Sequence, residues 1–394
     1  MSRSLSLRAA VAVLLLTAVG ACGGVARYTL PPGPPLDTPT PAPPATPSPT
    51  PTPGPFSLVG SMSVGRKEHT ATLLRDGTVL IAGGYDGLKY LSSAELYDPK
   101  TRKFKRVGSL AHARAAHAAT LLRDGRVLIT GGYDGKSATA SAEMYDPGTQ
   151  TFRLIGYMRA PRWSQTAIVL TSGANFGNVL IAGGFGKSGS LSSAEIYDVS
   201  KNKFLPTKSM KIPRYYATAT LLRDGNVLIT GGFSNSGISL GNCEVYYSAD
   251  GKFHTTGSMK DGRVQHTATR LLDGRVLVTG GFDKAQNTYD FSAEIWNPAT
   301  NKWSPTGSMT NRRAWQTATL LPDGRVVVMG GFDGARYLNT SDVYDPRTGK
   351  FTPRGTMSAA RSEETATPIK GGLVLVVGGY DGVSSLKSAE LYRP

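Results

Sequence analysis

Carboxylates and histidines that could perform acid–base chemistry lie near both ends of the folded part of the chain. Glu68 and His69 are adjacent, and Glu363 and Glu364 form a second acidic pair close to the C-terminus. A carboxylate beside an imidazole can transfer a proton or hold a metal ion. Together with His117, these residues are a candidate acid–base cluster. A structural role is the alternative, because the two histidines occupy one position of a repeated sequence.

Aromatic residues that could bind a ligand follow a repeated arginine or lie in neighbouring loops. Exposed aromatic rings stack on the faces of sugars and anchor peptides. The candidate ligand-binding residues are Trp163, Tyr215, Tyr216, Trp315, Tyr289 and Tyr337. Local packing between adjacent loops is the alternative reading of the same residues.

The repeated arginine could itself form an anion site, since a ring of guanidinium groups binds carboxylates and phosphates. The seven arginines are Arg66, Arg114, Arg162, Arg214, Arg263, Arg313 and Arg361. Every repeat also carries one carboxylate further along, from Glu95 in the first to Glu390 in the last. Equal numbers in fixed register favour structural ion pairs, because unpaired cations so close together would repel one another.

The elements that position these residues repeat along the chain. Seven Gly-Gly pairs, from 83–84 to 378–379, follow apolar runs at spacings of 48 to 52 residues. Each repeat reads as four short strands. In five of the seven repeats an Asp-Gly pair, such as Asp76-Gly77, predicts a two-residue hairpin with positive φ at both turn positions. We expect the aromatic residue after each Gly-Gly pair to lie in the core.

The two ends of the repeated region complete one another. The last repeat stops after its third strand, and residues 56–62 match the fourth strands at 253–259 and 303–309. Four-stranded units that cannot bury both faces alone must stack on neighbours. We therefore predict an all-β fold, a seven-bladed β-propeller of four-stranded antiparallel blades, closed by an N-terminal strand that completes the last blade.

The repeat resembles the Kelch family, including bacterial Kelch proteins related in fold to galactose oxidase. The resemblance rests on the apolar run ending in Gly-Gly, the Glu-x-Tyr-Asp of the third strand and the aromatic residue of the fourth. It covers residues 56–394. The fourth-strand aromatic is mostly Phe here, with Trp only at Trp303, where Kelch repeats usually have Trp.

The resemblance also bears on activity. A copper radical enzyme like galactose oxidase needs a Cys–Tyr crosslink and two histidine ligands, whereas Cys243 lies inside a repeat strand where a buried, inert thiol is expected. We expect no cofactor and no metal. The resemblance to Kelch-fold sialic acid mutarotases implies a second alternative, a cofactor-free carbohydrate-active enzyme.

The N-terminus reads as a targeting segment. Residues 1–22 combine Arg3 and Arg8 with an apolar run too short to span a bilayer, and they end in a sequence that resembles a bacterial lipobox. We expect Cys22 to be lipidated, an ordinary cleaved signal peptide being the alternative. Residues 23–55 are rich in Pro and Thr and predict a disordered, extended stalk. The propeller then spans 56–394.

The net charge of the chain indicates which kinds of partner it can bind. The chain has 44 Lys and Arg against 28 Asp and Glu, a formal net charge of +16 spread without a basic block. This excess favours anionic surfaces, and for an exported protein we expect no nucleic acid. We predict an exported, lipid-anchored monomer facing the cell exterior or periplasm. Its longer, more variable loop face would recognise a glycan, a cell-wall polymer or a protein partner.

Overall fold

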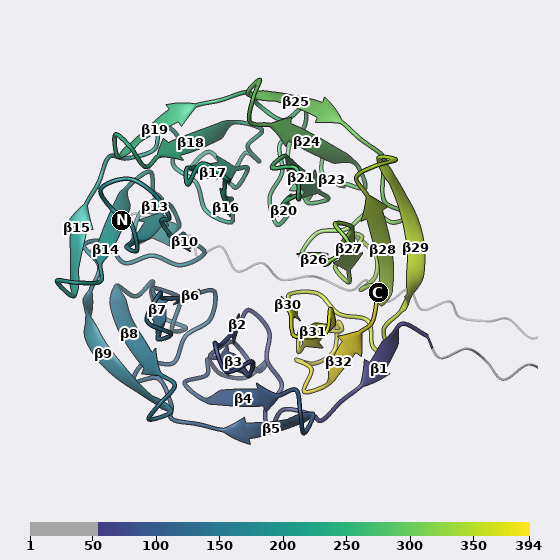
Figure 1. Ribbon diagram of the computed structural model, residues 1–394, viewed down its shortest axis with the longest axis horizontal. Coiled ribbons are helices and arrows are strands. Elements are labelled where there is room, and N and C mark those ends of the chain that lie inside the picture. Colours follow the sequence, from purple (N-terminus) through teal and green to yellow (C-terminus); the bar gives the residue numbers. More distant parts are fainter. Residues whose placement is uncertain (1–53) are drawn as a thin grey trace, which may run out of the picture. The chain divides into compact units, whose positions relative to one another are not determined.

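The computed structural model describes residues 54–394, which form a closed ring of seven four-stranded antiparallel sheets (Figure 1). The predicted all-β, seven-bladed propeller is therefore confirmed. Cys22 and almost all of the predicted stalk lie outside the described residues. In the part of the chain that the structure describes, no helix is long and apolar enough to cross a membrane.

The strands of each blade follow one another from the centre of the ring to its rim. Blade 1 comprises β2 (Thr70–Leu73), β3 (Val79–Ala82), β4 (Ala94–Asp98) and β5 (Lys103–Arg106). Blade 2 comprises β6 (Ala118–Leu121), β7 (Val127–Thr130), β8 (Ser141–Asp146) and β9 (Thr151–Tyr157). Blade 3 comprises β10 (Thr166–Val169), β11 (Val179–Ala182), β14 (Ala194–Asp198) and β15 (Lys203–Pro206). Blade 4 comprises β16 (Thr218–Leu221), β17 (Val227–Thr230), β18 (Cys243–Tyr247) and β19 (Lys252–Thr255).

Blades 5 to 7 repeat this arrangement. Blade 5 comprises β20 (Thr267–Arg270), β21 (Val276–Thr279), β24 (Ala293–Asn297) and β25 (Lys302–Pro305). Blade 6 comprises β26 (Thr317–Leu320), β27 (Val326–Met329), β28 (Thr340–Asp345) and β29 (Lys350–Thr356). Blade 7 comprises β30 (Thr365–Pro368), β31 (Val374–Val377), β32 (Ala389–Tyr392) and the N-terminal β1 (Phe56–Leu58).

Strand β1 closes the ring as the sequence predicted. It pairs antiparallel with β32, with Phe56 opposite Tyr392 and Leu58 opposite Glu390. The inner strand of blade 7 also contacts the inner strand of blade 1, as in every other pair of neighbouring blades. One blade is thus built from both ends of the described chain.

The predicted hairpin geometry was wrong in one respect. Gly77 has a φ of 88°, whereas Asp76 is not among the residues with positive φ. The Gly77 N–H donates to the Leu74 carbonyl, and the Leu74 N–H donates to the Thr78 carbonyl. This is a three-residue loop with glycine at the left-handed position, which only the residue without a Cβ adopts at no steric cost.

The hydrophobic core lies between the blades. In each of seven clusters, apolar side chains from one blade pack against those of its neighbour, as Val79 and Ile81 do against Leu375 and Val377. The second strand of every blade is fully buried. Each blade therefore depends on both neighbours for burial of its faces.

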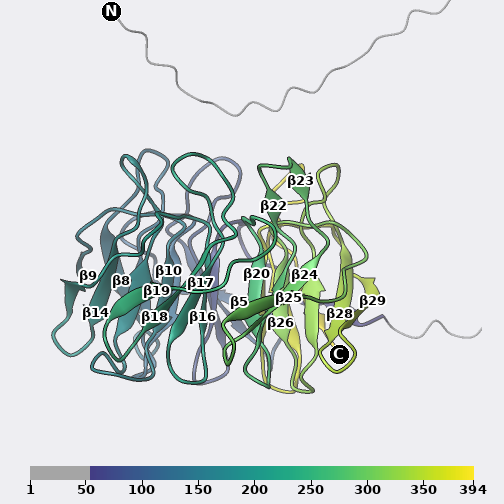
Figure 2. The ribbon, with the colours of Figure 1, turned by 90° about the horizontal axis from the view of Figure 1, so that it is seen from above.

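The two faces of the ring differ. The Asp-Gly turns lie on one face, and the loops between second and third strands lie on the other, which we call the upper face (Figure 2). Two of these upper loops form short hairpins, β12 (Phe185–Gly186) with β13 (Gly189–Ser190) and β22 (Phe282–Asp283) with β23 (Thr288–Tyr289). The links between blades also reach the upper face, where the candidate site lies.

Candidate functional site

The seven repeated arginines are buried and paired within their own blades. Each is at most 1% exposed. Each Nη2 lies 2.7–3.1 Å from the third-strand carboxylate, and each Nη1 donates to the carbonyl of the first glycine of the Gly-Gly pair. Arg66 and Glu95 are typical, and Glu95 also accepts from the Ser63 N–H. These guanidinium groups tie loop to strand and present no ring of unpaired cations to the channel.

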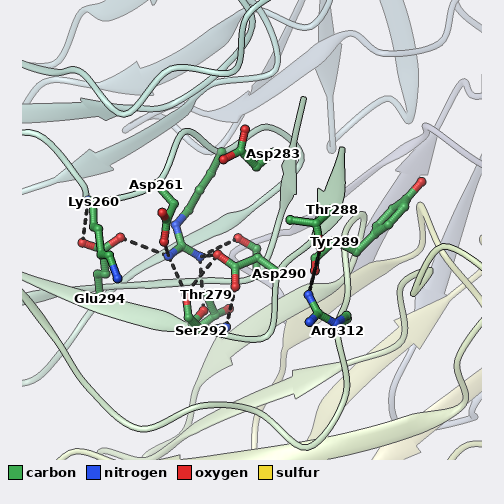
Figure 3. Close-up of polar contacts among 12 residues, drawn as sticks. Lys260, Asp261, Thr279, Asp283, Thr288, Tyr289, Asp290, Ser292, Glu294 and Arg312 are labelled. Atoms are coloured by element: carbon green, nitrogen blue, oxygen red, sulfur yellow. Dashed lines mark hydrogen bonds and ion pairs between the residues drawn. The ribbon is translucent and has the colours of Figure 1, made fainter. Parts of the chain in front are cut away.

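Blade 5 adds carboxylates to this arrangement. Arg263 contacts Glu294 at 3.0 Å, Asp290 at 2.7 Å and Asp261 at 4.0 Å. Asp290 occupies a position where five other blades have leucine. Figure 3 shows Asp261, Asp290 and Glu294 gathered in this blade, with Arg312 beside Tyr289. The Arg312 Nη1 donates to the Tyr289 carbonyl at 2.8 Å, which fixes the upper loop of blade 5.

Two positions after each arginine, a residue with a left-handed backbone reaches the axis of the ring. We call these seven residues the mouth ring: Glu68, Ala116, Ser164, Tyr216, Gln265, Trp315 and Glu363. Their φ angles lie between 50° and 58° although none is glycine. Non-glycine residues in this conformation store strain and concentrate at functional sites.

Backbone hydrogen bonds join neighbouring members of the mouth ring. Ala116 donates to Glu68, Ser164 to Ala116, and Tyr216 to Ser164, at 2.8–3.2 Å. Trp315 likewise donates to Gln265, and Glu363 donates to Trp315. The ring consists of two backbone arcs, one from blades 1 to 4 and the other from blades 5 to 7.

The mouth ring surrounds a cavity of about 310 Å³ on the propeller axis. All seven members line it, together with the residue that follows each of them. These following residues are His69, His117, Gln165, Ala217, His266, Gln316 and Glu364. The cavity therefore unites the predicted acid–base cluster with Tyr216 and Trp315 from the predicted aromatic set, which the sequence treated as separate sites.

The histidines of the cavity bridge neighbouring blades. His69 Nε2 lies 2.9 Å from Thr365 Oγ1, and His117 Nε2 lies 2.9 Å from Thr70 Oγ1. His266 contacts Thr218 in the same manner at 3.2 Å. Burial lowers the pKa of His69 and of His266 to about 3. These imidazoles are neutral near pH 7 and serve as links between blades.

The carboxylates of the cavity have raised pKa values. Burial, and then the charge of Glu363, raise the pKa of Glu68 to about 7, although Lys67 opposes them. Burial raises the pKa of Glu364 to about 8, and this side chain is 6% exposed. Glu363 is paired with Lys67 Nζ at 3.1 Å. Groups that gain or lose a proton near pH 7 are suited to proton transfer and to cation binding.

Tyr216 shows that opposite sides of the mouth ring face one another. Burial raises the pKa of Tyr216, and the charges of Glu68 and Glu363 raise it further. Tyr216 belongs to blade 4, whereas the two glutamates belong to blades 1 and 7. The phenol and the carboxylates therefore lie in one electrostatic environment.

The remaining predicted aromatic residues lie outside the cavity. Trp163, Tyr215, Tyr289 and Tyr337 belong to an aromatic belt on the upper face, whose ring centroids lie 4.8–6.2 Å apart. The belt touches the mouth ring where Tyr215 and Trp163 meet Tyr216, at 5.2 and 5.5 Å, and where Tyr289 meets Trp315 at 6.2 Å. Packing of belt against mouth ring holds the two cavity aromatics in place.

The aromatic residues that follow the Gly-Gly pairs are half-buried members of this belt, so the expectation that they form core was wrong. Tyr85 illustrates the reason. It bridges to Lys67 rather than continuing β3, and Gly84, with a φ of 100°, turns the backbone towards the upper face. The ring therefore packs on other loop residues and stays partly exposed.

Sequence reasoning missed several cavity residues, among them Ser164, Gln165, Gln265 and Gln316. Aligning the seven repeats on their constant arginine would have indicated this part of the cavity. The position two residues after the constant arginine holds six different residue types in seven blades. Such variation beside a constant residue marks a functional surface on a repeated scaffold.

Comparison with known proteins agrees with this architecture. The Kelch motif is matched at residues 69–111, 114–159, 265–310 and 317–358. These ranges contain the four strands of blades 1, 2, 5 and 6. The described chain is thus a β-propeller that carries Kelch motifs, an architecture that indicates a module for protein or ligand interaction. No curated protein matches the sequence.

One solved structure with a similar fold is a fungal alcohol oxidase in complex with copper. Its TM-score is 0.67 at 18% sequence identity, and the match covers 86% of this chain and 76% of that one. This likeness concerns the fold alone. Within residues 54–394, no group of three or more His, Cys, Asp or Glu side chains is placed to hold a metal ion. Cys243 is buried, and burial raises its pKa to about 12. These residues do not fit a copper centre.

Proposed function

We propose that this protein is a cell-surface binding module whose mouth-ring cavity holds a glycan, most directly one end or one residue of a cell-wall polymer. One observation carries the proposal: Tyr216 and Trp315 line a cavity of about 310 Å³ together with carboxylate and amide side chains. Sugar sites combine aromatic faces with polar groups that fix orientation. In this proposal Cys22, lipidated, anchors the exported chain to the membrane.

The experiment is binding to an array of glycans and wall polymers at two salt concentrations. Trp315→Ala removes an aromatic face from the cavity, and Tyr85→Leu is the matched control because the Tyr85 ring packs on Tyr90 within the belt. We expect salt-tolerant binding to a defined sugar, lost in Trp315→Ala and kept in Tyr85→Leu. Binding that both variants keep, or that salt abolishes, would move the site away from the cavity.

A second candidate is a cofactor-free enzyme that acts on the bound sugar, as Kelch-fold mutarotases do. The observation in its favour is the raised pKa of Glu68 and of Glu364, which lets a carboxyl group give and take protons near pH 7. An acidic sugar is a poor substrate for a cavity with three glutamates. Anomer exchange of neutral sugars, followed by NMR, distinguishes the candidates: an enzyme accelerates exchange and Glu68→Gln abolishes the acceleration.

A further inference from the structure

Carboxyl groups gather in the cavity although the whole protein is positively charged. The chain carries a formal charge of +16, yet three glutamates line the cavity against one neighbouring lysine. That lysine, Lys67, is already paired with Glu363 and lies over the Tyr380 ring at 4.7 Å. The nearest arginines are taken by their own third-strand carboxylates. Glu68 and Glu364 therefore lack a cation of their own in the described chain.

Hydrogen-bond acceptors are also left over. Gln165 Nε2 donates to the Thr130 carbonyl at 2.7 Å, and Gln316 Nε2 donates to the Thr279 carbonyl at 2.8 Å. Since a carbonyl only accepts, these contacts fix the orientation of both amides. Within residues 54–394, their Oε1 atoms and Glu364 Oε2 have no hydrogen-bond partner. All three side chains are 6–8% exposed and line the cavity.

Aromatic faces accompany these acceptors. Tyr216 and Trp315 lie on separate arcs of the mouth ring, and both line the cavity. An aromatic face attracts a cation through its quadrupole and stacks on the apolar face of a sugar. Carboxyl groups that gain or lose a proton near pH 7, surplus acceptors and aromatic faces together suit a ligand that brings positive charge, several N–H donors and a sugar ring. A bound cation favours the ionised form of such a carboxyl group.

We propose that the cavity recognises a sugar that carries a protonated primary amine. This inference rests on the proposed function and names its ligand class. The ammonium group donates to Glu68 and to the carbonyl oxygens of Gln165 or Gln316, and the sugar face packs on Trp315. Acetylation of the amine removes the charge and two of its donors.

The test compares two oligomers that differ only at that amine. Binding of a glucosamine tetramer and of an N-acetylglucosamine tetramer is measured by calorimetry at pH 7 and 150 mM salt, with full-length protein. We expect the free-amine oligomer to bind at least about ten-fold more tightly, as one charge-assisted hydrogen bond provides. Glu68→Gln should abolish this preference without weakening the acetylated oligomer.

Matched variants keep the result interpretable. Asp134→Asn removes an exposed carboxylate from the upper face outside the cavity and should leave the preference unchanged. Trp315→Ala should weaken both oligomers equally. Each variant is compared with the wild type by thermal unfolding, so that loss of fold is seen separately from loss of binding.

The outcomes separate the two proposals. Equal or tighter binding of the acetylated oligomer overturns the amine inference and leaves glycan binding standing. An equal loss of preference in Asp134→Asn and Glu68→Gln would likewise overturn it, since overall charge would then explain the effect. No binding of any glycan, together with capture of a lysine-bearing peptide by the cavity, would overturn the proposed function as well.

Discussion

Each constant arginine is a charge removed from water, and its stability depends on one carboxylate. Arg162 is fully buried and lies 2.9 Å from Glu195, itself almost fully buried. Burial lowers the pKa of Arg162, and Glu195 opposes that effect. Breaking such a pair leaves one charge without compensation in the interior, which costs more than the pair itself contributes.

Replacing Arg162 with Met should therefore lower the free energy of unfolding by about 3–5 kcal/mol. Arg126→Met is the control, because Arg126 and its partner Asp124 are both more than a third exposed, and exposed pairs contribute at most about 1 kcal/mol. Urea denaturation of both variants measures the difference. Equal effects in the two variants would show that the buried pairs have no special weight.

Glu364 gives a pH-dependent prediction. Its pKa in the folded protein is about 8, above the ordinary 4.5, so the native state binds more protons than the unfolded state between those values. The stability of the protein should fall as pH rises from about 5 to 8. Glu364→Gln keeps the shape and removes the titration, and Gln165 and Gln316 already occupy the equivalent position in other blades.

We therefore expect Glu364→Gln to lie close to the wild type at pH 5 and to exceed it at pH 8 by on the order of 4 kcal/mol. The new amide can donate to the Met329 carbonyl as Gln165 does to that of Thr130. Urea denaturation at both pH values is the measurement. A constant difference between the two proteins at both values would argue against a titrating Glu364.

At the scale of elements, strand β1 makes the ring a closed object. It is the outer strand of blade 7, and only one of its sides pairs, with β32. The Val59 N–H donates to the Ala389 carbonyl and the Arg393 N–H donates to the Pro55 carbonyl. In an antiparallel ladder the bonded pairs alternate, so Ser57 belongs to the bonded set and Leu58 to the other.

Proline at these two positions should therefore have unequal effects. Ser57→Pro removes a ladder hydrogen bond, whereas the Leu58 N–H faces away from β32 and Leu58→Pro removes none. We expect Ser57→Pro to lower the melting temperature by about 2 °C relative to Leu58→Pro. Differential scanning calorimetry provides the comparison. A larger effect of Leu58→Pro would mean that β1 holds a different register.

The strands, the number of blades and the closure of the ring could be predicted from the sequence more completely than the candidate site. The Gly-Gly spacing and the displaced fourth strand determine blade number and closure, because both are local patterns repeated along the chain. The joining of Tyr216 and Trp315 with Glu68 and Glu363 depends on the left-handed backbone of the mouth ring. Residue types alone carry no sign of that conformation, since the ring holds Trp, Tyr and Glu where glycine or asparagine is usual.

At the scale of the whole molecule, each part of the hydrophobic core is formed by two neighbouring blades. Trp296 of blade 5 packs among residues of blade 4, and Val327 of blade 6 packs against Val374 and Val376 of blade 7. Every interface between blades is thus shared, and the closed ring has no terminal blade with a free face. Loss of one interface should be felt around the entire ring.

A cavity in one interface should therefore destabilise the whole propeller in a single transition. Val327→Ala should lower the free energy of unfolding by about 2 kcal/mol. Far-UV circular dichroism and tryptophan fluorescence should report the same shifted midpoint, although Trp296 lies in another interface. Separate midpoints for the two signals would instead indicate blades that unfold independently.

The left-handed mouth ring has a consequence for how this protein can change over generations. Its geometry is held by backbone bonds, so a mutation of Ser164 or Gln265 alters what the cavity touches while leaving those bonds in place. A left-handed backbone conformation is unfavourable for β-branched residues and for proline. None of the seven mouth-ring positions contains either kind of residue. Substitutions at the mouth ring can thus change ligand preference one blade at a time. The residue types that each position accepts are limited by its positive φ angle.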